Sequence, residues 1–130
     1  MDNGKIVLPE SGGKGVELFN AGKYFQCHDV FEELWISARG EEKIYYQGII
    51  QLAVALYKIV DEPNWRGATS LLTTGSSLLK SVNGERAGID IKDAVDKAET
   101  LLASLEKMGP ERMGEIKREG LFKLNYRQQL

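Results

Sequence analysis

The sequence has few of the residues whose type or spacing usually indicates a function. It holds one cysteine, Cys27, so no disulfide can form within the chain, and one histidine, His28. Its 17 Lys and Arg against 19 Asp and Glu give a net charge of -2, whereas nucleic-acid-binding surfaces need a basic excess. The sequence also lacks a signal peptide and any run of eighteen apolar residues. We therefore expect a cytoplasmic protein that binds neither nucleic acid nor membranes.

The sequence also lacks any segment that alternates apolar and polar residues as a half-buried strand would. Apolar residues instead recur at helical spacing, and the connections between these stretches are short. This predicts an all-α antiparallel bundle of about five helices. We expect helices over 14–21, 24–38, 41–60, 64–82 and 91–108, within a single domain at 14–118, a flexible N-terminal arm at 1–13 and a C-terminal tail at 119–130.

A candidate site lies in the stretch "CHDVFEELW", residues 27–35. His28 and Glu32 are four residues apart, so they share one face of a helix, about 40° apart around its axis. Their neighbours on that face include Phe31 and Trp35, which predicts that both polar side chains point toward the core. Asp29 falls at the boundary of the apolar face. A buried Glu32 would need a partner, because an unpaired buried carboxylate costs several kcal/mol.

The helix expected at 41–60 carries a matching polar pair, Gln47 and Gln51. If the two helices are antiparallel neighbours, these amides meet His28 and Glu32 across the interface and complete a hydrogen-bond network. Arg66, near the start of the next helix, is a further candidate counter-ion for Glu32.

Three blocks of the sequence, within residues 18–80, resemble the family known as domain of unknown function 309. They are "AGKYFQCHDVFEELW", "YYQGIIQLAVALYK" and "NWRGATSLLTTGSSLL". The sequence departs from the family pattern at Asp29, where the family usually has glutamate. The resemblance implies a small helical bundle and, as a conjecture attached to some family members, a metal-dependent hydrolase. The residues that match the family's marked positions are His28, Glu32, Trp35, Gln47, Gly48, Gln51, Asn64, Gly67 and Ala68.

A metal site is one hypothesis for this cluster. His28 and Glu32 can be two ligands of a zinc or manganese ion, and Asp29 is a weaker third candidate. The H-E-x-x-H and E-x-x-H motifs of known metal sites are absent. Metal-free catalysis is a second hypothesis, in which Glu32 orients His28 for proton transfer. It lacks a nucleophile, because Cys27 points about 100° away around the helix.

Two other interpretations need no chemistry at the cluster. The first is a buried network that fixes the register of two helices. The second is a pocket for a small polar ligand, lined by Gln47, Gln51, Trp35 and Arg66. We take a metal or polar-ligand site, with hydrolysis as its extension, as the leading hypothesis. The alternative is a non-enzymatic interaction module, and the exposed small residues expected on the helix at 64–82 then suggest a homo-oligomer.

Overall fold

The computed structural model of the chain describes residues 10–82, 85–86 and 88–127. It confirms the all-α bundle. The helices are α1 (Glu10–Asn20), α2 (Tyr24–Ser37), α3 (Gly40–Val60), α4 (Trp65–Lys80) and α5 (Ile91–Met108), followed by 3-10 helices at Pro110–Glu115 and Arg118–Gly120. Two short strands, β1 (Glu85–Arg86) and β2 (Ile89–Asp90), precede α5 and pair antiparallel. Each strand is two residues long, too short to show the alternation by which strands are predicted.

The helix starts follow local capping chemistry. The Asn64 side chain accepts a hydrogen bond from the Gly67 backbone at 2.8 Å, and the Asp90 side chain accepts one from the Asp93 backbone at 3.0 Å. Both caps agree with the sequence. Helix α1 begins at Glu10, four residues before the expected start. Its glycine-rich first turns have low helix propensity. The glycine at position 15 allows close packing of α1 on α2, because a Cβ there would lie 2.6 Å from the Phe31 ring.

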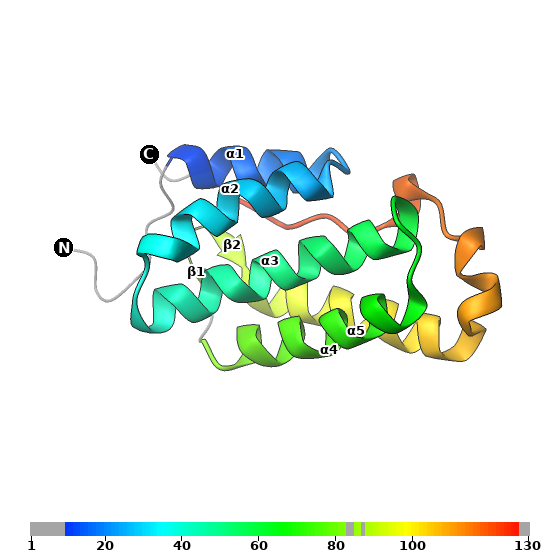
Figure 1. Cartoon of the computed structure of the whole chain (residues 1–130). Coiled ribbons are helices and arrows are strands. Elements are labelled where there is room, and N and C mark those ends of the chain that lie inside the picture. The colour runs from blue at the N-terminus through cyan, green and yellow to red at the C-terminus, as the bar shows by residue number, and fades with distance from the viewer. Residues whose placement is uncertain (1–9, 83–84, 87, 128–130) are drawn as a thin grey trace.

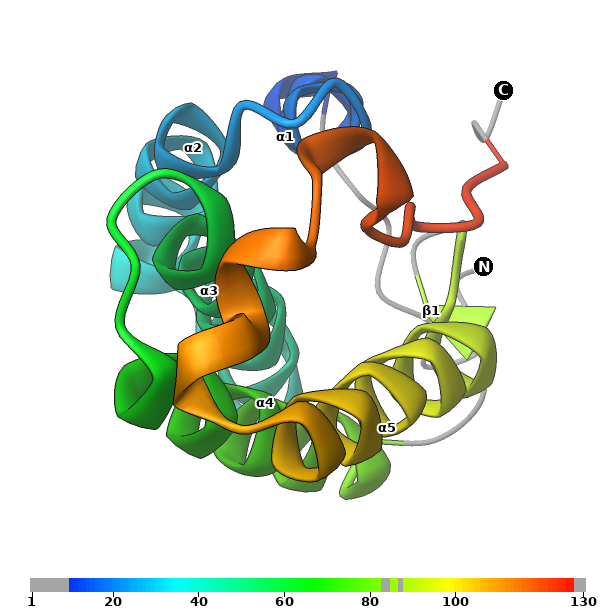
Figure 2. The same ribbon diagram turned by 90° about the vertical axis from the view of Figure 1, so that its right-hand side faces the viewer.

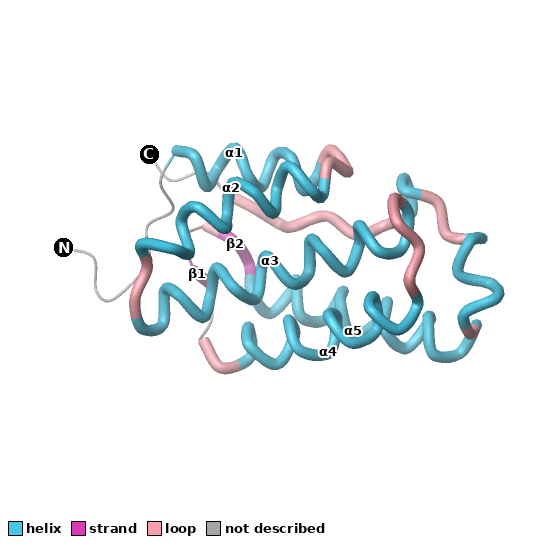
Figure 3. The backbone as a smooth tube through the Cα atoms, viewed as in Figure 1, coloured by secondary structure: helices cyan, strands magenta, loops and turns pink. Residues whose placement is uncertain are grey.

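The five α-helices follow one another around an open ring, and each packs against the next (Figures 1 and 2). Helix α3 lies between α2 and α4, and it contributes nine of the buried residues. The loops between helices are short, as the tube in Figure 3 shows. No helix in the described ranges is long and apolar enough to span a bilayer.

The C-terminal segment closes the ring (Figure 2). Of the residues expected as a tail, Leu121 and Leu124 are buried in the core, and Tyr126 forms an antiparallel bridge with Ile89. The segment therefore completes the core between the first and last helices. Residues 1–9 of the expected arm and 128–130 of the expected tail lie outside the described residues.

The buried hydroxyl and thiol groups predict a loss of stability at alkaline pH. Burial raises the pKa of Cys27 from 9.0 to about 12 and that of Tyr24 from 10.0 to about 12. Burial likewise raises the pKa of Tyr46 to about 12 and that of Tyr45 well above its ordinary value. These groups ionise first in the unfolded chain, so their contribution is complete below pH 9 and is lost as the pH rises toward 12.

We expect the free energy of unfolding from urea titrations to fall between pH 9 and 11, by up to about 1.4 kcal/mol per pH unit for each group that ionises. A Tyr46→Phe variant should show a shallower decline, because it has one such group fewer. A free energy that stays level from pH 8 to 11 would show that these groups remain hydrated in the native state.

Candidate functional site

Three ligand-type side chains gather within one turn of α2. The imidazole Nε2 of His28 lies 2.9 Å from a carboxylate oxygen of Glu32, and its Nδ1 lies 3.2 Å from Oδ1 of Asp29. Each residue offers one ligand atom, and these three atoms lie within 4.8 Å of one another. The pair expected from the i,i+4 spacing is therefore present, and Asp29, the weaker candidate, is part of the same group.

The cluster is accessible, which corrects the expectation that His28 and Glu32 point into the core. The side chains of His28, Glu32 and Asp29 are 23%, 49% and 62% exposed. The buried stripe of α2 is Tyr24, Cys27 and Phe31, and its centre lies about 70° from His28 and about 110° from Glu32 around the helix. The sequence shows a broad apolar arc, but only the part that faces α1 and α3 is covered.

An aromatic ring lies beside the cluster. Phe25 is 52% exposed, and its ring centroid is 5.4 Å from those of both His28 and Tyr57, the latter on α3. On the other side, a shallow depression is lined by Asp29, Val30, Glu32, Glu33 and Ile36. The cluster thus adjoins an exposed aromatic ring, and two of its carboxylates line an acidic depression.

Gln51 and Gln47 do not complete a network with His28 and Glu32, which corrects the second expectation. The Gln51 side chain accepts a hydrogen bond from the Thr74 hydroxyl on α4. Gln47 is half-buried, and in the described part of the chain its side chain has no hydrogen-bond partner. The two glutamines follow the stripe of α3 that includes Gly48, whose neighbours are Leu79 and Gly75 of α4. This stripe faces α4, whereas α2 packs on another side of α3.

In the described residues, Trp35 and Arg66, the other expected ligand-binding residues, form no hydrogen bond or ion pair with the cluster. The Lys43 ammonium lies 4.2 Å from the Trp35 ring centroid, a cation–π contact between α2 and α3. The indole Nε1 of Trp35 is buried and has no hydrogen-bond partner in the described residues. Arg66 is exposed, and among those residues its side chain forms no ion pair, so it is not a counter-ion for Glu32.

Cys27 takes no part in the cluster. Its side chain is fully buried on the core side of α2, and burial raises its pKa to about 12. The thiol is therefore neutral and inaccessible, as its position on the helical wheel predicted.

Sequence reasoning missed Phe25 and Ile36 as parts of the site. Both are large apolar side chains, yet Phe25 is 52% exposed and Ile36 is 65% exposed. The signal that could have found them is their spacing from the buried stripe of Tyr24, Cys27 and Phe31. Both lie far from its centre, on the side of the carboxylates.

Comparison with known proteins places the cluster inside a recognised domain. The model of the family described as "Domain of unknown function (DUF309)" matches residues 13–71, which include α2, α3 and the start of α4. The chain is also similar to the uncharacterized protein YpuF of Bacillus subtilis (strain 168). The two are 37% identical over 67 residues, which are 51% of this chain and 38% of that protein. Neither match carries an assigned activity. Residues 13–71 of the chain are therefore similar to the domain that defines this family.

Proposed function

We propose that the His28–Asp29–Glu32 cluster binds a divalent metal ion and that the protein is a metal-dependent hydrolase of the cytoplasm. The observation that carries the proposal is the convergence of an imidazole and two carboxylates, with ligand atoms within 4.8 Å of one another, on an accessible face. The unpaired, buried thiol supports the assignment to a reducing compartment.

The donor set fits a transition metal. Imidazole nitrogen and carboxylate oxygen are ordinary ligands of zinc and manganese, and ligand atoms around such an ion lie about 3–3.5 Å apart. The ligand atoms lie within 4.8 Å of one another, and the Glu32 and Asp29 side chains are exposed, so solvent leaves them room to turn toward an ion. Because all three ligands come from one turn of one helix, the solvent side stays open for water and substrate.

The residues of the chain have distinct roles in this proposal. The Nε2 atom of His28, which lies beside Glu32, is the imidazole ligand atom, and the Asp29 carboxylate turns from Nδ1 toward the same ion. The Phe25 ring packs against the imidazole and limits its movement. A bound divalent ion supplies a hydroxide nucleophile at neutral pH, which is the chemistry that hydrolysis needs.

Calorimetric titration with zinc or manganese tests the proposed site. We expect the full-length chain to bind about one ion and Glu32→Gln to bind at least tenfold more weakly, because it loses a charged ligand. Glu33→Gln is the matched control, since Glu33 is the next residue on α2 and is exposed but outside the cluster. Equal weakening in both variants would mean that general negative charge, and no defined site, attracts the ion.

A second candidate function is an interaction module, and the exposed apolar side chains of α2 favour it. In the described residues the exposed large hydrophobic side chains are Phe25 and Ile36, and both adjoin the cluster. A partner, including a second copy of the chain, can cover such residues. A Phe25→Ser, Ile36→Ser double variant that loses a partner while its metal binding is unchanged would support this function.

A further inference from the structure

A depression in the surface lies where the turn between α1 and α2 and the first turn of α2 meet the end of α3. Its volume is about 370 Å³, within the range of about 300–1,000 Å³ that is typical of small-molecule sites. Its lining includes two aromatic side chains, Phe25 and Tyr57, and three charged ones, Lys23, Asp61 and Arg118. Small-molecule sites combine apolar walls with a few polar groups in this way.

Phe25 connects this depression with the candidate metal site. Its ring centroid lies 5.4 Å from that of Tyr57, which also lines the depression, and 5.4 Å from that of His28 in the cluster. The Phe25 side chain is 52% exposed, so part of the ring is open to solvent. A planar group of a substrate can stack on that ring and would then lie next to the imidazole.

The depression beyond Phe25 and the acidic depression beside the cluster differ in charge. The first has two basic residues, Lys23 and Arg118, against one carboxylate, Asp61. In the acidic depression all three charged residues of the lining are carboxylates, and two of them belong to the cluster. A negatively charged group is therefore attracted to the first and repelled from the second, which orients an anionic molecule at the cluster.

Arg118 is held in the wall of the depression by the turn between α1 and α2 and by the end of α3. Its guanidinium donates a hydrogen bond to the Gly22 carbonyl at 2.6 Å and one to the Asp61 carboxylate at 3.1 Å. Gly22 has a positive φ of 79°, and a Cβ there would lie 2.7 Å from the Arg118 Cδ. Glycine at this position therefore leaves the room that the arginine side chain occupies.

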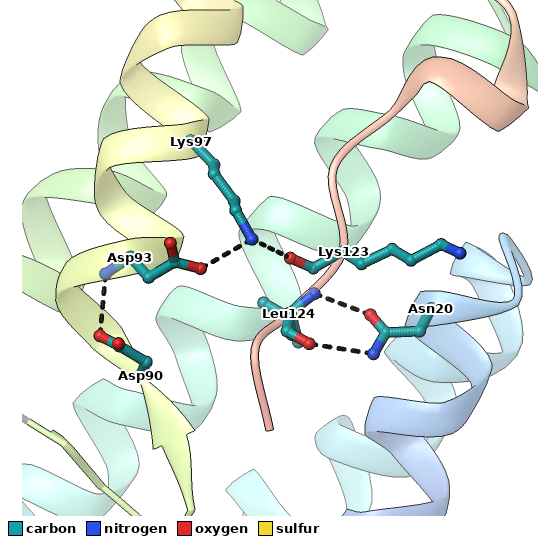
Figure 4. A network of polar contacts seen from close by, with 6 residues as sticks. All are labelled: Asn20, Asp90, Asp93, Lys97, Lys123 and Leu124. Atoms are coloured by element: carbon teal, nitrogen blue, oxygen red, sulfur yellow. Dashed lines mark hydrogen bonds and ion pairs between the residues drawn. The ribbon is translucent and has the colours of Figure 1, made fainter. Parts of the chain in front are cut away.

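The chain that follows Arg118 is also anchored to α1 (Figure 4). The Asn20 side-chain amide accepts a hydrogen bond from the Leu124 backbone nitrogen at 2.7 Å and donates one to the Leu124 carbonyl at 3.0 Å. The wall that contains Arg118 is thus fixed before any ligand binds. A preorganised site lowers the entropy cost of binding.

Lys23 supplies the charge that is available to a ligand. It is exposed, and within the described ranges its ammonium forms no ion pair. Asp61 balances the charge of Arg118, with which it forms an ion pair. The lining is therefore left with one unpaired positive charge, which matches a group with one negative charge, such as a carboxylate.

We propose that this depression is the substrate subsite of the metal centre and that the substrate is a small aromatic ester with a carboxylate on its ring. The ring stacks on Phe25, the carboxylate faces Lys23, and the ester group lies on the side of His28. In the reaction, water adds to the ester carbonyl carbon and the bond from that carbon to the ring oxygen breaks. The acid and the phenol are released, and the phenol oxygen takes a proton from the water. The role as a substrate subsite rests on the proposed hydrolase.

Titration of the isotopically labelled full-length protein with benzoate, followed by NMR in the presence of a chelator, tests the subsite without any metal. We expect the backbone amide signals of residues 22–26 and 57–61 to shift. Phe25→Ala should weaken benzoate binding at least threefold, because the stacking ring is lost. Lys23→Gln should weaken benzoate binding by a similar factor and leave the binding of benzyl alcohol, which has no charge, unchanged.

Lys107→Gln is the matched control, since Lys107 is an exposed lysine of α5 outside the depression. If circular dichroism shows that Phe25→Ala does not fold, Phe25→Leu, which also lacks the ring, replaces it under the same criterion. Benzoate that shifts none of these signals would overturn the subsite. So would equal affinity for benzoate in the wild type, the Phe25 variant and Lys23→Gln.

Hydrolysis by the metal-loaded protein tests the substrate class. We expect kcat/KM to be at least fivefold higher for para-acetoxybenzoate than for its neutral methyl ester, and Lys23→Gln to remove this preference. Equal values for the two esters in the wild type would overturn the proposed substrate class. If neither ester is hydrolysed while benzoate binds as expected, the proposed hydrolase is contradicted and the depression is supported as a binding site for aromatic carboxylates.

Discussion

Replacement of Gly48 by valine should lower the free energy of unfolding by about 3 kcal/mol, measured by urea denaturation. Gly48 of α3 lies where α4 approaches most closely. A Cβ built there would be 2.7 Å from both Cγ and Cδ2 of Leu79 and 3.4 Å from the Gly75 carbonyl oxygen. Leu79 is fully buried, so it has no free space to move into. The gain in helix propensity, at most about 1 kcal/mol, is smaller than the cost of overpacking.

Gly75 of α4 faces Gly48 of α3, so each glycine lies close to the backbone of the other helix. A Cβ on Gly75 would lie 3.1 Å from Leu52 and 3.3 Å from the Gly48 carbonyl oxygen. Gly114→Ala is the matched control, because nothing lies within 4 Å of a Cβ at that position. We expect it to change stability by less than about 0.5 kcal/mol. If Gly48→Val were equally mild, the spacing of α3 and α4 would not depend on these glycines.

His28→Ala should remove metal binding and leave the stability of the fold nearly unchanged. The loss of the imidazole ligand should weaken zinc or manganese binding at least 100-fold, because only two carboxylate ligands remain. The contacts of His28 with Asp29 and Glu32 are partly exposed, and polar contacts of this kind contribute about 0–1 kcal/mol. Alanine also has a higher helix propensity, which offsets part of that loss.

Metal affinity and the free energy of unfolding of His28→Ala together distinguish an accessible metal site from a buried structural network. In a buried network, His28→Ala would leave the Glu32 carboxylate buried without a partner, and the free energy of unfolding would fall by several kcal/mol. Calorimetric titration and urea denaturation on the same preparation give both values. Retention of metal affinity in a folded His28→Ala variant would exclude this cluster as the site. A folded variant that is less stable by 3 kcal/mol or more would favour the network.

The helices were predictable because their signals are local. Asn64 and Asp90 cap α4 and α5, and the observed helices Trp65–Lys80 and Ile91–Met108 agree closely with the expected ranges 64–82 and 91–108. The start of α1 at Glu10 was not predictable from propensity, since its first turns contain Gly12 and Gly13. The role of segment 121–127 depends on contacts with Asn20, more than one hundred residues earlier, which no local pattern encodes.

The candidate site was predictable in its residues and not in its environment. The spacing of His28 and Glu32 sets their proximity, since residues four apart on a helix are neighbours. Their exposure depends on which part of the apolar arc of α2 is covered by α1 and α3, which is a property of the packing. Gln51 was expected to bond to His28 and Glu32 but bonds to Thr74 of α4, and the reason is the same. α3 is apolar around most of its circumference, so its sequence does not say which stripe meets α2 and which meets α4.

Elemental analysis of tag-free protein, purified without chelators, tests the central claim most directly. The account predicts about one zinc, manganese or iron ion per chain in the wild type, and its loss in the folded His28→Ala variant. Wild-type protein that stays free of metal after dialysis against each of these ions would contradict a metal site at His28, Asp29 and Glu32.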